Sequence, residues 1–412
     1  MKYSQAVICA SLWSVMAVTN AYAQRGPVLE GTSVQAQAAQ MQSTASYWTP
    51  ERMASAKPMP TPLVKVTALS LAFPPASQEG DTLAVPGYVP GCRPNTPNCG
   101  PAARTLAFQD ALSSESVAPG DLLQPMHGVK PTNPLTGPYG PFQRWREANP
   151  ITAYPKSTVG KLFFTLNGIN FVCSASVIGR STLITAGHCN SDGTQTFATN
   201  RLFCPSFNGV ADPVRGCWSV VGSVVSAPWH NSGDPDYDYS CLITATTGTR
   251  VANKIGNVTG WLGRAWNFAS SQAERTFGYP QAAPFTGGTL QTTASTEWYT
   301  HDFRAGGQIS KIIGSDLTGG SSGGPWILEW TGGLAETADT DASLATDPGS
   351  NWVNGVNSHK RCLVNCNTPP TTTNGVFWQE MTSPPFRAGS ATDLNESEDV
   401  IGICLANANN NP

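Results

Sequence analysis

The sequence has few charged residues for its length, and this scarcity narrows the classes of function. Charged residues make up 12% of the 412-residue chain, with a formal net charge of −3, whereas an average soluble domain carries about 25%. The chain has no basic run, so a nucleic-acid partner is not expected. Helical apolar periodicity is scarce, and beyond the N-terminus no apolar stretch has the roughly 20 residues that span a membrane.

The first 23 residues have the pattern of a signal peptide. Lys2 supplies a positive start, "AVICASLWSVMAV" an apolar stretch, and Ala21-Tyr22-Ala23 small residues for cleavage. The alternative, a membrane anchor, requires a longer apolar run. We therefore expect residues 1–23 to be removed and the protein to be secreted or periplasmic, with no membrane contact afterwards.

The cysteines fit an exported protein. Of eleven cysteines, Cys9 lies in the signal peptide, and the even set that remains favours disulfides over zinc ligation. Closeness in sequence predicts the pairs Cys92–Cys99 and Cys362–Cys366. Hairpin-like segments predict Cys204–Cys217 and Cys173–Cys189, and elimination leaves Cys241–Cys404.

Residues 24–150 differ in composition from the rest of the chain. They hold 19 of its 33 prolines, and proline cannot donate a hydrogen bond to a β-ladder. The stretches "PGYVPGCRPNTPNCGP" and "KPTNPLTGPYGPF" are therefore not expected to form regular ladders, and we predict an extended, partly ordered extension. The extension is either a propeptide or a stalk-like linker. If it is a propeptide, we expect a stretch such as "KPTNPLTGPYGPF" to lie along "GVNSHK" (355–360).

Residues 151–412 have the texture of an all-β domain. Runs such as "VGKLFFTL", "FVCSASVI", "STLITAGH" and "CWSVVGSVVSA" are rich in β-branched and aromatic residues, and turn residues separate them. Many short strands at this spacing predict a barrel or a sandwich.

The stretch "TGGSSGGP" (318–325) is either a flexible linker or a nucleophile loop. A serine hydroxyl such as that of Ser322 becomes a nucleophile only with a base and with donors for the oxyanion. Among five histidines, His188 follows a strand-like run in "LITAGHC", and Asp238 heads the apolar run in "DYSCLI". Taken singly, His188 could be a core histidine and Asp238 a turn or cap residue; Asp236 is a nearby rival for the carboxylate.

Together, "TAGHC", "DYSCLI" and "GGSSGGP" resemble the chymotrypsin-like serine peptidases, in which histidine, aspartate and serine follow in the same order. The resemblance covers roughly Thr152 to Ser358. "YPKSTVGKLFF", "FGYP" and "DLTGGSSGGPW" are most similar to the bacterial glutamyl-endopeptidase-like branch. The resemblance implies two antiparallel six-stranded β-barrels preceded by the proline-rich extension.

The resemblance also implies roles for the three residues. Ser322 attacks the scissile carbonyl, His188 transfers the proton, and Asp238 orients the imidazole. The N–H groups of Gly320 and Ser322 are expected to form the oxyanion hole.

The sequence departs from the family pattern near the serine. Ser321 stands where an acid usually receives the new N-terminus, so the usual activation switch is not expected. Asp316 has the position of the acid that binds basic side chains in trypsin-like enzymes. Asn357, Ser358 and His359 belong to the expected substrate-binding strand, and Asn357 replaces the histidine of the glutamyl branch, so a glutamate preference is not supported.

The sequence thus predicts an exported serine endopeptidase, a monomeric zymogen that acts on polypeptides without a metal or organic cofactor. The alternative is a catalytically silent homologue that acts as a binding module. An acidic stretch with Asp339, Asp341 and Asp347 is either a calcium ligand set or a solvated loop.

Overall fold

A computed structural model provides the fold. It describes residues 26–31, 34–66, 81–91, 142–147, 151–269, 272–301, 309–330, 351–362, 366, 379–390 and 392–408. The expected signal peptide, the Cys92–Cys99 pair and the acidic stretch at 339–347 lie outside these residues. Within the described part of the chain, no helix is both long and apolar enough to cross a membrane.

The first sheet closes into a six-stranded barrel. Its strands follow the order β10-β11-β8-β7-β6-β9, and β9 pairs back to β10. The pairs in this circle are antiparallel, as expected from the sequence. Its strands are β6 (Val159–Leu166), β7 (Ile169–Gly179), β8 (Thr182–Thr185), β9 (Thr199–Pro205), β10 (Trp218–Val225) and β11 (Ser240–Thr244).

The second sheet fits the second barrel. Strands β16, β13, β14, β15 and β19 are neighbours in that order, and β17 pairs with β16. An antiparallel bridge between His359 and Thr382 joins the residues after β17 to β19. The strands are β12 (Gly263–Trp266), β13 (Ala273–Gly278), β14 (Gln291–His301), β15 (Ser310–Gly314), β16 (Pro325–Leu328), β17 (Trp352–Val356), β18 (Lys360–Cys362) and β19 (Glu380–Ser383).

The proline-rich extension contains both helices and short strands. Its described parts form α1 (Val34–Tyr47), α2 (Pro50–Ser55), β1 (Val28–Gly31), β2 (Lys57–Pro58), β3 (Leu63–Lys65), β4 (Leu83–Val85) and β5 (Phe142–Arg146). All five strands pair with the body. They are short and join existing sheets at their margins, where proline is tolerated. The two stretches that are not expected to form regular ladders, 86–101 and 130–142, lie mostly outside the described residues.

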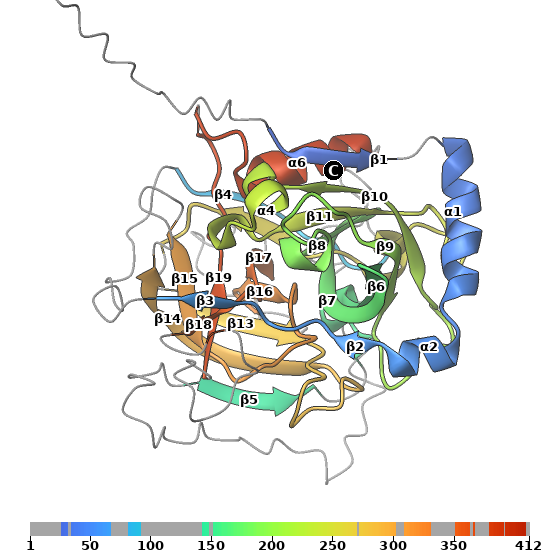
Figure 1. Cartoon of the computed structure of the whole chain (residues 1–412), viewed down its shortest axis with the longest axis horizontal. Helices are drawn as coiled ribbons and strands as arrows, with labels where there is room; N and C mark the ends of the chain where they lie inside the picture. The colour runs from blue at the N-terminus through green and yellow to red at the C-terminus, as the bar shows by residue number, and fades with distance from the viewer. Residues whose placement is uncertain are drawn as a thin grey trace, which may run out of the picture.

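The remaining helices are short connections, except the last. They are η3 (Lys156–Thr158), η4 (Gly187–Cys189), α4 (Ala227–Ser232), η5 (Pro235–Tyr237), α5 (Ile255–Thr259) and α6 (Ser397–Asn407). In Figure 1, α6 lies beside β10 and β11, and α1 stands at the opposite end of β10. These helices cover the first barrel, which explains why β10 is buried along its whole length.

Four disulfides lie in the described part of the chain. They join Cys173 to Cys189, Cys204 to Cys217, Cys241 to Cys404, and Cys362 to Cys366. The pair assigned by elimination links β11 to α6 and so fixes the C-terminal helix on the first barrel.

Candidate active site

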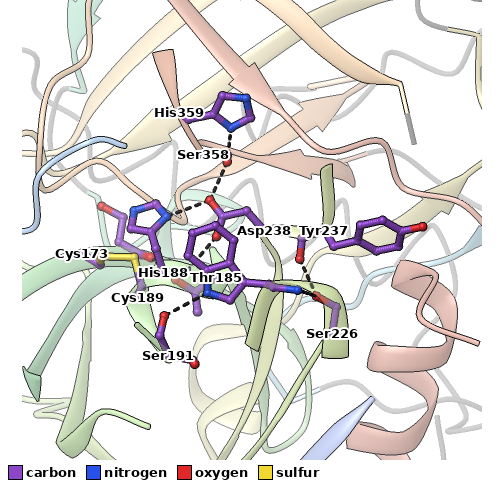
Figure 2. A network of polar contacts seen from close by, with 12 residues as sticks. Cys173, Thr185, His188, Cys189, Ser191, Ser226, Tyr237, Asp238, Ser358 and His359 are labelled. Carbon is purple, nitrogen blue, oxygen red and sulfur yellow. Dashed lines mark hydrogen bonds and ion pairs between the residues drawn. A yellow bond between two sulfur atoms is a disulfide. The ribbon is translucent and has the colours of Figure 1, made fainter. Parts of the chain in front are cut away.

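His188 is held by the first barrel. It lies in η4, directly after β8, and the Cys173–Cys189 disulfide ties this turn to β7. Its Nδ1 lies 2.8 Å from Asp238 Oδ2, and its backbone N–H donates to Asp238 Oδ1 at 2.7 Å. One carboxylate therefore holds both the ring and the backbone of the histidine (Figure 2).

Asp238 owes its position to a short turn before β11. Asp234 accepts the backbone N–H of Asp236 at the start of η5, and the chain then enters β11 two residues after Asp238. Asp236, the rival carboxylate, instead accepts the hydroxyl of Ser310 at 2.8 Å. Of the two acids, Asp238 is the one that contacts His188.

Two residues of the expected substrate-binding strand extend this network (Figure 2). Ser358 Oγ donates to Asp238 Oδ2 at 2.5 Å, and His359 Nδ1 lies 2.6 Å from Ser358 Oγ. Because a hydroxyl has one proton, which Ser358 donates to Asp238, His359 must donate Nδ1–H to Ser358. Burial raises the pKa of Asp238, but His188 and the hydrogen bond from Ser358 outweigh it and lower this pKa below its ordinary value.

The loop that carries Ser322 comes from the second sheet, between β15 and β16. Gly320 has φ +96°, a conformation that favours glycine. The backbone N–H of Ser174, on β7, donates to Ser322 O at 2.7 Å. A Cβ on Gly323 would lie 2.8 Å from Ala186 N, two residues before His188. The structure thus brings the serine loop against the turn that carries the histidine.

The side chains of Ser322 and His188, the candidate nucleophile and base, are buried. Ser322 is 1% exposed and His188 is 2% exposed. Within the described part of the chain, neither Ser322 Oγ nor His188 Nε2 has a hydrogen-bond partner. Ser321, which replaces the usual acid, donates its hydroxyl to Thr318 O at 2.7 Å and so stabilises the loop without an ion pair.

Of the expected oxyanion-hole donors, the N–H of Gly320 is occupied. It donates at 3.1 Å to the carbonyl oxygen of Met59, a residue of the proline-rich extension. In the full chain, this donor is therefore bonded to the extension, and its role in an oxyanion hole stays a prediction.

The expected specificity residues contact other parts of the protein. The guanidinium of Arg144, on β5, lies 3.0 Å from the carboxylate of Asp316, so this acid is already neutralised. Asn357 donates to Phe277 O at 2.9 Å and to Ser321 O at 3.1 Å, and it accepts the indole N–H of Trp326 at 2.9 Å. The Asn357 amide therefore supports the serine loop.

Sequence reasoning missed Lys360. Its buried ammonium donates to Ser315 O at 3.2 Å and to Glu380 O at 2.5 Å. Burial lowers the pKa of Lys360 to about 7, although the carboxylates of Asp316 and Glu380 act in the opposite direction. The residue lies within "GVNSHK", but no pattern in the sequence indicates that a lysine there is buried.

The site has no metal-binding set among the described residues. Cys173, His188 and Cys189 are close enough in space to share an ion, but the two sulfur atoms form a disulfide with each other. A disulfide sulfur is not a thiolate ligand, so only the imidazole remains.

The chain is similar to several known proteins. No family model matches the chain. The chain is 28% identical over 203 residues to a glutamyl endopeptidase of Bacillus licheniformis, which covers 47% of this chain and 57% of that protein. It is 24% identical over 181 residues to a Bacillus subtilis protein named extracellular metalloprotease, which covers 44% of this chain and 52% of that protein. The chain therefore spans about half the length of the curated relatives it matches.

Two solved structures are similar as well. One is the protease Anisep from Arthrobacter nicotinovorans, with 28% identity and a TM-score of 0.46, covering 61% of this chain and 95% of that one. The other is the thermostable serine protease AL20 from an extremophilic microorganism, with 30% identity and a TM-score of 0.45, covering 58% and 95%. The chain is thus similar to a curated glutamyl endopeptidase, and it carries its histidine, aspartate and serine motifs in the order found in chymotrypsin-like serine peptidases.

Proposed function

We propose that the protein is an exported serine endopeptidase that hydrolyses peptide bonds through an acyl-enzyme. The observation that supports this most strongly is the buried pair of His188 and Asp238, which lies against the loop of Ser322. A carboxylate that accepts Nδ1–H leaves Nε2 of the same ring as the proton acceptor. The pair supplies the base that a serine nucleophile requires. Ser322 Oγ and His188 Nε2 would have to approach each other for the reaction, because neither atom has a hydrogen-bond partner in the described part of the chain.

The reaction follows from these positions. Ser322 Oγ bonds to the scissile carbonyl carbon while His188 Nε2 takes the hydroxyl proton. The tetrahedral intermediate collapses, the C–N bond breaks, and His188 returns the proton to the leaving amine. Water then attacks the acyl-enzyme in the same way, releasing the acid and restoring Ser322. Asp238 stabilises the imidazolium in both halves.

Backbone donors would stabilise the oxyanion. The N–H groups of Gly320 and Ser322 are proposed to face the carbonyl oxygen, and loss of one such donor costs about 3 kcal/mol in the transition state. Gly320 already donates to a carbonyl oxygen at 3.1 Å in this structure.

Processing is part of the proposal. Residues 1–23 would direct export, and the four disulfides suit an oxidising compartment. Most of residues 24–150 would be a propeptide whose removal yields the active monomer. The docked strands and helices of this extension support a propeptide over a loose stalk.

A fluorophosphonate probe tests the nucleophile. In the labelling reaction, Ser322 Oγ bonds to phosphorus, fluoride leaves, and the hydroxyl proton passes to His188. We expect mass spectrometry to find the label on Ser322 after limited proteolysis of the extension. Ser322→Ala should abolish labelling, whereas the adjacent Ser321→Ala should retain it. If neither the full chain nor the processed chain is labelled, the result favours the silent binding module.

A further inference from the structure

Residues 57–66, here called the strap, cross the candidate active site from one sheet to the other. The strap begins as β2, which pairs in parallel with Phe171 and Val172 of β7. It ends as β3, which pairs in parallel with β18. In Figure 1, the blue strand β3 lies beside β18 and the chain continues from β2 beside β7. Of the stretch expected along "GVNSHK", residues 130–141 lie outside the described residues, and Phe142 pairs with Ser295 of β14.

The strap is bonded to the body at each step of this path. The N–H of Met59 donates to Val172 O at 2.9 Å. Further along, the N–H of Lys360 donates to Pro62 O at 3.0 Å, and the N–H of Val66 donates to Cys362 O at 2.8 Å. The strap therefore uses the backbone edge of the second sheet that a substrate would use.

The middle of the strap occupies the oxyanion position. Met59 O accepts the N–H of Gly320 at 3.1 Å. A Cβ on the neighbouring Gly319 would lie 2.8 Å from the same oxygen, so the serine loop has no side chain where the strap passes. This contact, together with the burial of Ser322 and His188, means that the site is closed to substrate.

The direction of a productive substrate follows from the chemistry. His188 must protonate the leaving amine, so the C-terminal part of a substrate lies on the side of His188. The Cys173–Cys189 disulfide ties that side to β7. The acyl part, which stays on Ser322, then lies toward β18. A substrate therefore runs from β18 to β7, from its N-terminus to its C-terminus.

The strap runs in the opposite direction, from β7 at residue 57 to β18 at residue 65. We propose that the strap is an intramolecular inhibitor that fills the site with reversed polarity. This proposal rests on the proposed function, and it identifies the ligand of the site in the full chain as an extended, proline-rich peptide bound backwards.

Reversed polarity explains why the strap would survive in contact with Ser322. The carbonyl at Gly320 belongs to Met59, and its C–N bond leads to Pro60, toward β18 and away from His188. Attack by Ser322 would form a tetrahedral adduct whose leaving nitrogen cannot receive the proton of His188. The adduct would expel Ser322 again, and the peptide bond would stay intact.

The composition of the strap suits a bound extended peptide. Pro58, Pro60 and Pro62 occupy alternate positions of "KPMPTPLVKV" and restrict φ before binding, which reduces the entropy lost on ordering. Upstream, the amide of Gln281 donates to Ala56 O at 2.7 Å. The ring centroid of Trp48, which is 4% exposed, lies 5.4 Å from that of Phe163. This contact anchors the preceding segment on the first barrel.

The first test weakens the strap without altering the body. In the full chain, Met59→Pro removes the N–H that bonds to Val172, whereas Met59→Leu retains it. We expect Met59→Pro to raise the rate of fluorophosphonate labelling about tenfold, because the loss of one backbone hydrogen bond weakens the binding of the strap by about that factor. Met59→Leu should label as slowly as the unaltered chain. Leu83→Pro, in β4, is a second control that disturbs the extension away from the site.

The second test measures polarity directly. Lys57 and Phe171 are paired residues, so Lys57→Cys/Phe171→Cys should form a disulfide under non-reducing conditions. The crosslinked chain should not be labelled until it is reduced. Lys65→Cys/Phe171→Cys is the matched control, because residue 65 would approach residue 171 only if the strap ran the other way. A crosslink in the control variant alone would overturn the reversed polarity.

The outcomes separate this proposal from the proposed function. If the unaltered full chain labels as fast as Met59→Pro, with its extension intact by mass, the strap does not inhibit while Ser322 is still a nucleophile. If the Lys57→Cys/Phe171→Cys crosslink forms but no variant labels, in the full chain or after limited proteolysis, the strap is placed as proposed and the peptidase function fails.

Discussion

Asp238 is the residue on which the site depends most. Its carboxylate accepts the ring and the backbone N–H of His188 and the hydroxyl of Ser358. An ionised carboxylate can accept all three, because it has only acceptors. An asparagine would place an NH2 group against at least one of these donors, and the imidazole would turn to the other tautomer.

Replacement of this carboxylate is therefore expected to be severe and specific. Asp238→Asn should lower kcat by about 10^4 with little change in KM, because the wrong tautomer cannot accept the proton of Ser322. Asp236→Asn is the matched control: it lies two residues away, is buried, and retains an acceptor for Ser310. Steady-state kinetics on the processed protein measure both, and equal losses would show that the pair has been assigned wrongly.

At the scale of elements, β5 places part of the extension in the peptidase body. It pairs with five consecutive residues of β14, and its Arg144 neutralises Asp316. Burial raises the pKa of Asp316, although Arg144 counteracts this. We therefore propose that β5 stays with the folded body, whose boundary would then lie before residue 142 instead of near residue 151, where the composition changes.

Two truncations compare these boundaries. A chain that begins just before Phe142 should keep β5 and unfold at a higher temperature than one that begins at Ile151. The shorter chain loses the pairing of β5 with β14 and leaves the partly buried Asp316 without Arg144. The cost of about 3–5 kcal/mol for losing a fully buried ion-pair partner is an upper limit for this carboxylate. Thermal unfolding of the two forms measures the difference. Equal transition temperatures would assign β5 to the removable extension.

These elements also show what the sequence can and cannot predict. The "TAGHC", "DYSCLI" and "GGSSGGP" segments are local patterns, so the positions of His188, Asp238 and Ser322 were predictable. The contact of Arg144 with Asp316 joins residues 172 apart, and that of Met59 with Gly320 depends on which edge the extension meets. Composition indicates a proline-rich segment, but it does not indicate its docking site or its direction.

At the scale of the whole molecule, two buried lysines link stability to pH. Burial lowers the pKa of Lys161 to about 8 and that of Lys360 to about 7. In the unfolded chain a lysine titrates near 10.4. Between these values the unfolded state binds more protons than the folded state, so the free energy of unfolding rises with pH.

Denaturant unfolding between about pH 7 and 9.5 should show that the free energy of unfolding rises with pH. Each lysine can contribute at most about 1.4 kcal/mol per pH unit to this rise. Lys360→Met removes one titrating group and should flatten the curve, whereas Lys57→Met, at an exposed position, should leave it unchanged. If Lys360→Met and the unaltered protein have the same slope, Lys360 does not titrate in this range.

The position of the strap along the chain has a consequence in time. Residues 57–66 are synthesised before Ser322, because translation begins at the N-terminus, and one continuous chain joins the two. On the proposal above, no molecule completes its nucleophile loop before its own inhibitor is present, tethered at a high effective concentration. The producing cell would then need no separate inhibitor protein, and the ratio of inhibitor to enzyme would be one to one in every molecule.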